Sequence, residues 1–227
     1  MQAKVEHVSA LLDRITQGFA PAAFASSLSI VDMVLLDLID RRRLKIDVYT
    51  LDTGRLHDET YALMQRVRAR YKTRVHVVFP ERRAVEAYVA ANGPNAFYDS
   101  IMLRQSCCEI RKVGPLKRVL AGKRAWITGL RREQSPTRRD LPLQEFDTAN
   151  GLEKFNPLAD WSTEDVWSYI RHHEVPFNPL QETGFVSLGC APCTRAIAAG
   201  DDIRAGRWWW EDPAHKECGL HKHKKTA

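Results

Sequence analysis

Five cysteines are spaced so that four thiols suited to a metal are separate from one reactive thiol. Cys107 and Cys108 are adjacent, Cys190 and Cys193 form a C-x-x-C pair, and Cys218 stands alone near the end of the chain. An odd number of cysteines in a chain without an export sequence argues against a disulfide framework. The spacing therefore predicts one four-ligand metal site and one separate functional cysteine.

Two kinds of metal site suit four thiolates, and the adjacent pair distinguishes them. Structural zinc is usually held by two C-x-x-C turns, because neighbouring side chains cannot both approach one tetrahedral ion without strain. An iron–sulfur cluster is larger, so Cys107 and Cys108 can each reach a different iron atom. The pair favours a cluster, with zinc and buried reduced cysteines as the alternatives. Arg104, Arg111 and Lys112 would help to balance the negative charge of a thiolate-bound cluster.

The fifth cysteine, Cys218, lies in the basic sequence HKECGLHKHKK. Positive neighbours lower the pKa of a thiol and populate its thiolate, and a terminal segment can swing into and out of a site. Cys218 is therefore a candidate nucleophile. The residues leave two alternatives open, which are an incidental exposed cysteine and a member of a His/Cys metal cluster.

The composition is that of a globular protein with an anionic partner. The 227 residues are 44% hydrophobic and 27% charged, with a net charge of +6, which suits one α/β domain and excludes a disordered chain. Positive charge suits nucleic acid or a small polyanionic substrate, and a solvated basic surface is the plain alternative. No apolar run approaches the roughly 20 residues that cross a bilayer, and residues 1–19 lack a signal-peptide pattern. We therefore expect a cytoplasmic protein with no membrane partner.

Helix-type and strand-type patterns alternate through the first 130 residues. Strands are predicted near residues 22–26, 44–51, 74–80 and 124–130. Helices are predicted near residues 2–19, 29–42, 57–71, 82–93 and 107–122, the last interrupted at Gly114–Pro115. This alternation predicts an α/β fold with a parallel twisted sheet flanked by helices. Beyond it, residues 143–161 predict a short hairpin, and a capping box from Ser162 to Asp165 predicts a helix.

Three polar loops begin where predicted strands stop. Their sequences are SSLSIVD, LDTG and TGLRREQSPTR. Parallel sheets bind ligands at the carboxyl ends of their strands, so these loops predict a shared crevice. The serines of the first loop and the helix N-terminus that follows them offer hydrogen-bond donors to an anion.

The chain also carries a set of motifs in a characteristic order: SSLSIVD, LDTGRLHDETY, CCEIRK, TGLRREQSPTR, CAPCTR, RAGRWWWE and HKECGLH. These motifs, which extend over nearly the whole chain, resemble the assimilatory adenylyl-sulfate reductases of the phosphoadenylyl-sulfate reductase family. The two cysteine pairs together with the terminal motif are a specific signal of this family, whereas LDTG alone is a weak one. The resemblance implies an adenine nucleotide α-hydrolase-like fold of the pyrophosphatase-type ATP-binding class. It places the reductase domain in residues 1–200 and a mobile segment with the catalytic cysteine in residues 201–227.

The same resemblance assigns roles to individual residues. It implies a [4Fe-4S] cluster held by Cys107, Cys108, Cys190 and Cys193, and it makes Cys218 the nucleophile. Binding of the nucleotide falls to the first two loops, through Ser26, Ser27, Ser29, Asp32, Leu51, Asp52, Thr53 and Gly54. Contacts with the phosphosulfate group fall to Lys112, Arg138, Arg204 and Arg207.

The resemblance further implies the reaction and its partners. The substrate would be adenosine 5′-phosphosulfate, and thioredoxin or a glutaredoxin-like dithiol protein would supply the electrons. Attack by the thiolate on sulfur would release AMP and leave an S-sulfocysteine, from which the dithiol releases sulfite. The family contains homo-oligomers, and no nucleic acid is expected as a partner.

The first loop departs from the family pattern at one position, because Val31 stands before Asp32 where an acid is common. It also lacks the SGG-x-DS pattern of enzymes that cleave ATP to pyrophosphate, which suits a substrate without pyrophosphate. Reduction of 3′-phosphoadenylyl sulfate on the same scaffold is the alternative, although the cysteine pairs favour the unphosphorylated substrate. A tRNA-thiolating enzyme would need the missing pyrophosphate loop, and a zinc-stabilised nucleic-acid-binding module would leave the nucleotide loops unexplained. Trp208–Trp210 are expected to serve packing.

Overall fold

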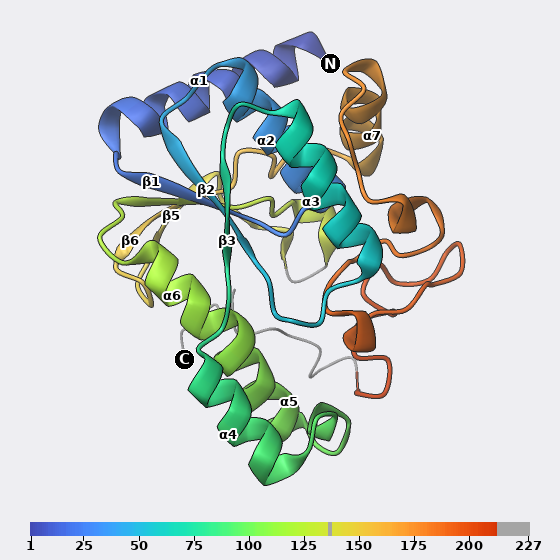
Figure 1. The fold of residues 1–227 in the computed structure, drawn as a ribbon. Coiled ribbons are helices and arrows are strands. Elements are labelled where there is room, and N and C mark those ends of the chain that lie inside the picture. The colour runs from blue at the N-terminus through green and yellow to red at the C-terminus, as the bar shows by residue number, and fades with distance from the viewer. Residues whose placement is uncertain (136–137, 213–227) are drawn as a thin grey trace.

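One six-stranded sheet runs through the computed structural model, which describes residues 1–135 and 138–212 (Figure 1). Its strands are β1 (Ala22–Ser26), β2 (Ile46–Leu51), β3 (Val75–Val78), β4 (Ala125–Ile127), β5 (Gln144–Asp147) and β6 (Leu152–Phe155). They lie in the order β3-β2-β1-β4-β6-β5, and every neighbouring pair is parallel except the antiparallel hairpin of β5 and β6. The predicted parallel sheet and the predicted hairpin are both confirmed.

Helices cover the two faces of this sheet. They are α1 (Gln2–Gly18), α2 (Ile30–Arg41), α3 (Asp58–Arg70), α4 (Arg82–Asn92), α5 (Ile101–Cys108), α6 (Gly114–Leu120) and α7 (Thr163–His172). Figure 1 shows α1, α2 and α7 on one side of the sheet and α4, α5 and α6 on the other. Among the described residues, none of the helices combines the length and the apolar character that crossing a membrane requires.

Alternate residues of the central strand β1 show why both faces need a helical cover. Ala22 and Phe24 belong to the large apolar cluster that α1, α2 and α7 form, whereas Ala23 packs with Leu116 and Leu120 of α6 on the other face. Successive side chains of a strand point to opposite faces. The apolar residues Ala22 to Ala25 therefore suit β1 to the centre of a sheet that is covered on both faces.

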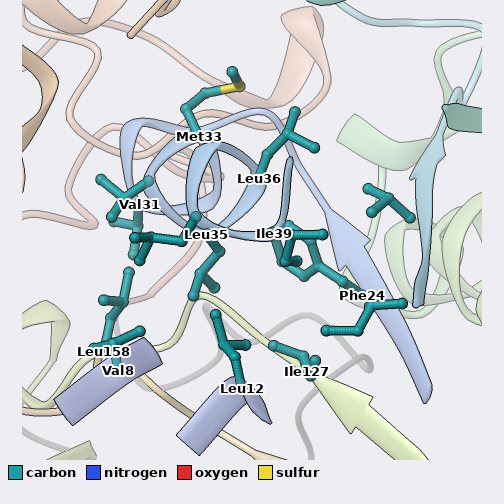
Figure 2. Packing of buried hydrophobic residues seen from close by; sticks show 14 of the residues in the cluster. Val8, Leu12, Phe24, Val31, Met33, Leu35, Leu36, Ile39, Ile127 and Leu158 are labelled. Carbon is teal, nitrogen blue, oxygen red and sulfur yellow. The ribbon is translucent and has the colours of Figure 1, made fainter. Parts of the chain in front are cut away.

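Helix α2 is buried almost completely and packs against both α1 and the sheet. Figure 2 shows Leu35 and Ile39 of α2 directed toward Leu12 of α1 and Ile127 of β4. Residues four apart lie on one face of a helix, so Leu35 and Ile39 together form a continuous apolar contact with α1 and β4. This packing holds the first turn of α2 beside the carboxyl end of β1.

The helical segment around the adjacent cysteines differs from the prediction. It starts at Ile101, six residues earlier than expected, because Ser100 caps it by accepting the Leu103 N–H at 3.1 Å. A π-helix, Glu109–Val113, joins α5 to α6, and Pro115 lies in the first turn of α6, where its missing N–H is not needed. The predicted interruption near Gly114–Pro115 corresponds to this π-helix, which ends at Val113, directly before Gly114.

The capping box predicted at the start of α7 is confirmed. The Ser162 hydroxyl accepts the Asp165 N–H at 3.0 Å, and the Asp165 carboxylate accepts the Ser162 N–H at 2.8 Å. Two N–H groups that the helix leaves without an internal partner are satisfied in this way.

Candidate active site

A cavity of about 360 Å³ opens at the carboxyl ends of the parallel strands, where the polar loops were predicted to meet. Ten of the predicted substrate-binding residues line it, and they come from five separate segments of the chain. They are Ser26, Ser27, Ser29, Asp32, Leu51, Thr53, Lys112, Arg138, Arg204 and Arg207. A concave site with a few convergent polar groups is the usual form of a small-molecule site.

Two predicted residues, Asp52 and Gly54, are not among the residues that line this cavity. The Asp52 carboxylate accepts the Gly54 N–H at 2.7 Å and the Tyr61 hydroxyl at 3.0 Å. Gly54 has φ +70°, which a residue with a side chain adopts only with strain. Both residues thus shape the turn that places Leu51 and Thr53 at the cavity.

The donors of the serine loop already have partners within the chain. The Ser27 N–H and the Ser27 hydroxyl both donate to the Asp32 carboxylate at 2.6 Å. The first N–H of α2, on Ile30, donates to the side-chain oxygen of Gln181 at 2.8 Å. These groups were predicted to face an anion, and in the structure they hold Asp32 and Gln181 instead. No feature of the sequence near Gln181 indicates this contact, which joins residues 151 positions apart.

Gly129, which the sequence analysis did not single out, lies against Asp32. A Cβ atom on Gly129 would stand 2.0 Å from the Asp32 carboxylate, a separation that only glycine avoids. Burial of the Asp32 carboxyl raises its pKa from 3.8 to about 6, although hydrogen bonds from Ser27 and Ser29 oppose the rise. The cavity therefore contains a carboxyl group that titrates close to neutral pH.

The pH dependence of stability should reveal this carboxyl. Between about pH 4 and pH 6 the unfolded chain loses its Asp32 proton before the folded chain does, so the native state loses stability as the pH rises. We expect the unfolding free energy of Asp32→Asn, which has no titrating group at this position, to rise by about 2 kcal/mol relative to the parent between pH 4 and pH 7. Urea unfolding of both proteins at pH 4 and pH 7 measures this change. If the free-energy gap between variant and parent is the same at the two pH values, burial does not perturb the pKa of Asp32.

The four described cysteines gather in one apolar cluster next to the cavity. Cys108, Cys190 and Cys193 are buried with Phe97 and Trp208, and Cys107 packs against them. None of the four forms a disulfide. The structure thus brings together the two pairs of cysteines that are more than 80 residues apart in the sequence.

Electrostatics at this cluster suit a group that binds thiolates. Burial, together with the neighbouring Cys190, raises the pKa of Cys193 to about 12. Burial also raises the pKa of Cys107, against the opposing effect of Arg111. At neutral pH, thiols with such raised pKa values stay protonated unless a metal ion binds the sulfur and displaces the proton. Within residues 1–135 and 138–212, however, no three cysteine, histidine or carboxylate side chains are arranged to hold a metal ion.

The cysteine site and the cavity share a wall. Lys112, Arg207 and Trp208 line both of them. Thr194, one residue after the C-x-x-C turn, forms an antiparallel bridge with Arg207, so the segment of residues 201–212 is tied to the cysteines. A change in the cysteine site would therefore move cations of the cavity.

Gly189 gives Arg207 its place in that wall. The Arg207 guanidinium donates to the Leu188 carbonyl at 2.9 Å and lies 4.7 Å from the centre of the Trp208 ring. A Cβ atom on Gly189 would stand 2.5 Å from this guanidinium. Gly189, directly before the C-x-x-C pair, thus makes room for an arginine side chain.

The three tryptophans have different surroundings. Trp208 is buried in the cysteine cluster, and Trp210 packs against that cluster. Trp209 and Trp210 meet Tyr98 edge to face, with the Trp210 and Tyr98 ring centres 4.5 Å apart. All three serve packing, as predicted, and Trp208 also lines the cavity. Cys218, the predicted nucleophile, lies outside the described residues.

Comparisons with known proteins agree with this geometry. The profile of the phosphoadenosine phosphosulfate reductase domain matches residues 21–196. An adenosine 5′-phosphosulfate reductase of Allochromatium vinosum is 56% identical over 212 residues, which are 93% of this chain and 83% of the relative. The enzyme of the same name from Burkholderia cepacia is 52% identical over 221 residues, covering 97% and 88% of the two chains.

Solved structures share the fold. A phosphoadenylyl-sulfate reductase from Candida auris, in a phosphate complex, superposes with a TM-score of 0.72 at 25% identity, over 84% of this chain and 90% of the other. An FMN adenylyltransferase of Candida glabrata superposes with a TM-score of 0.59 at 16% identity, over 99% and 75% of the two chains. The second likeness shows only that the two proteins share a fold, and both agree with the predicted fold class.

Proposed function

The chain belongs to the phosphoadenosine phosphosulfate reductase family, and on that basis we propose that it reduces adenosine 5′-phosphosulfate to sulfite and AMP in sulfate assimilation. It is an oxidoreductase that acts on a sulfur group. The observation that carries the proposal is the shared wall, since Lys112, Arg207 and Trp208 line both the nucleotide-sized cavity and the four-cysteine site. Relatives of this name are 46–56% identical to the chain.

Cations at one end of the cavity give the substrate its electrostatic support. A phosphosulfate carries negative charge on both its phosphate and its sulfate, so an anionic nucleophile is repelled unless that charge is neutralised. Lys112, Arg204 and Arg207 line the cavity, and Lys112 and Arg207 also line the cysteine site. Arg138 is oriented by donating to the Gln134 side chain at 2.7 Å. These groups would neutralise the leaving phosphate and polarise the sulfuryl oxygens.

In this proposal the Cys218 thiolate attacks the sulfur atom of the substrate. A sulfur–sulfur bond forms, the bond between sulfur and the phosphate oxygen breaks, and AMP leaves with the bonding electrons. A thiolate of thioredoxin or a glutaredoxin-like protein then attacks the Cys218 sulfur and displaces sulfite. Its second thiol resolves the mixed disulfide, so the dithiol supplies both electrons. We also propose a cytoplasmic location, where such dithiols remain reduced.

The four clustered cysteines are the residues that would hold a [4Fe-4S] cluster. The residues fit such a group because the four thiols gather in one apolar site and none of them forms a disulfide. When bound, the cluster would supply charge and order at the wall rather than electrons. The residues that transmit this order are Lys112, which follows the cysteine pair, and Arg207, which is bridged to the C-x-x-C turn.

The experiment that tests the proposal is intact-protein mass spectrometry of anaerobically purified enzyme incubated without reductant. We expect one sulfo group on Cys218 with adenosine 5′-phosphosulfate, and little with the 3′-phosphorylated nucleotide. Equal or greater labelling by the latter would favour 3′-phosphoadenylyl-sulfate reduction, which the likeness to the Candida auris enzyme makes the second candidate. The absence of an adduct with either nucleotide would contradict the proposed chemistry.

The contact of Gly189 with Arg207 predicts a further effect. Gly189→Ala should push the Arg207 guanidinium out of the shared wall, because the new Cβ would stand 2.5 Å from it. Loss of one cation that faces developing negative charge should slow adduct formation by roughly 10- to 100-fold. Mass spectrometry of reactions quenched at successive times measures the rate of adduct formation. Gly18→Ala is the matched control, since no atom lies within 4 Å of its new Cβ, and equal rates for the two variants would rule out the role given to Gly189.

A further inference from the structure

A buried ion pair joins the helix of the cysteine pair to the last described turn of the chain. Arg104 of α5 donates to both oxygens of the Glu211 carboxylate, from Nε at 2.9 Å and from Nη2 at 2.7 Å. The exposed fractions of the two side chains are 1% and 3%. Two parallel bonds between a planar guanidinium and a carboxylate fix orientation as well as distance.

The same guanidinium also contacts the cysteine site. It lies 4.6 Å from the centre of the Trp208 ring, and it shares a side-chain hydrogen bond with Cys108, four residues later on the same helix. The Glu211 N–H donates to the Trp208 carbonyl at 2.9 Å, which closes the turn. Arg104 therefore connects one proposed cluster ligand, one residue of the shared wall and the start of the C-terminal segment.

A gain in folding stability does not explain why this position holds a buried ion pair. Removing two charges from water has a desolvation cost that often equals their attraction, and apolar residues of similar size can replace a buried pair without loss. What an apolar contact lacks is the direction of the two hydrogen bonds. The pair is therefore suited to hold the backbone at Glu211 in one place.

That place matters because Cys218 follows Glu211 by seven residues. A chain spans at most about 3.6 Å per residue, so the anchor keeps the Cys218 thiol within about 25 Å of Glu211. A reactive group tethered close to its target meets it at a much higher effective concentration than a group on a long free chain. The ion pair therefore fixes the backbone position from which the segment that carries Cys218 begins.

We propose that Arg104 and Glu211 are positioning residues that fix where the C-terminal segment leaves the cysteine site, and that they thereby direct Cys218 to the substrate. This inference rests on the proposed function, because it needs Cys218 as the nucleophile. It assigns the pair to the sulfur-transfer step and not to nucleotide binding.

The test uses full-length enzyme with its iron and compares the parent with Glu211→Gln. We expect the nucleotide dissociation constant and the iron content to stay within about threefold of the parent, whereas adduct formation on Cys218 at saturating nucleotide slows at least 10-fold. Glu145→Gln is the matched control, because it breaks another largely buried pair, with Lys154 at 2.8 Å, in the distant β5–β6 hairpin. Its adduct rate should equal that of the parent.

A double variant, Arg104→Met with Glu211→Met, separates positioning from stability, because it removes both charges together and keeps the bulk. It should fold, bind nucleotide and still form the adduct slowly. An adduct rate equal to the parent in either variant, or a loss of iron and nucleotide binding in step with the rate, would overturn the inference. Absence of the adduct in the parent enzyme is a different result, which would overturn the proposed function and the inference with it.

Discussion

Replacement of Cys218 by serine should lower sulfite formation by on the order of 10³-fold or more and abolish the sulfo adduct. A hydroxyl at neutral pH carries almost no anionic form, whereas a thiol among lysines and histidines is partly ionised. Nucleotide affinity should change little, because the substitution leaves in place the ten predicted substrate-binding residues that line the cavity among the described residues. Sulfite release and equilibrium binding of the nucleotide, measured on the same preparation, separate the two effects.

Thr226→Ser is the control for this variant, since it changes the same terminal segment without removing a thiol. It should retain the parent rate. Should Cys218→Ser keep more than about 1% of the parent activity, the nucleophile would have to be sought among the four clustered cysteines instead.

Loss of the cysteine site should have the second largest effect. Cys193→Ser removes one of the four clustered thiols, and we expect the purified variant to lose most of its iron and sulfide. Adduct formation should fall by at least about 100-fold, because the wall residues Lys112 and Arg207 are fixed by the two cysteine segments. Iron and sulfide analysis, together with the thermal midpoint with and without iron, gives readouts that do not depend on activity.

Ser106→Ala is the matched control for the cysteine variant, because Ser106 is exposed and directly precedes the cysteine pair. It should keep both iron and activity. Full activity in protein from which iron has been removed would contradict the role given to the site, and iron retained by Cys193→Ser would contradict the ligand set.

The sequence predicted those features that depend on local patterns. Alternating apolar residues marked the strands, the pair Ser162 and Asp165 marked the start of α7, and the ends of the strands marked the edge at which the cavity lies. The four cysteines could be grouped because their type is rare and their spacing is specific. In each case the residues that carry the pattern are close together in the chain or belong to a known motif.

Features that depend on long-range packing could not be predicted. The contacts of Gln181 with Ile30 and of Glu211 with Arg104 join residues more than 100 positions apart, and nothing in either local sequence indicates the partner. The requirement for glycine at position 129 comes from the side chain of Asp32 and not from a turn. Because several arginines flank the cysteines, the sequence also did not distinguish which of them faces the thiols.

The π-helix after the cysteine pair makes the length of this segment functionally strict. A π-turn contains one residue more than the α-turn it replaces, and each residue rotates a helix by about 100°. Deletion of a single residue within Glu109–Val113 would therefore turn α6 away from the sheet, where Leu116 and Leu120 pack. It would also shift Lys112 relative to Cys107 and Cys108. We therefore expect insertions and deletions to be excluded from this segment in any relative that keeps both cysteine pairs.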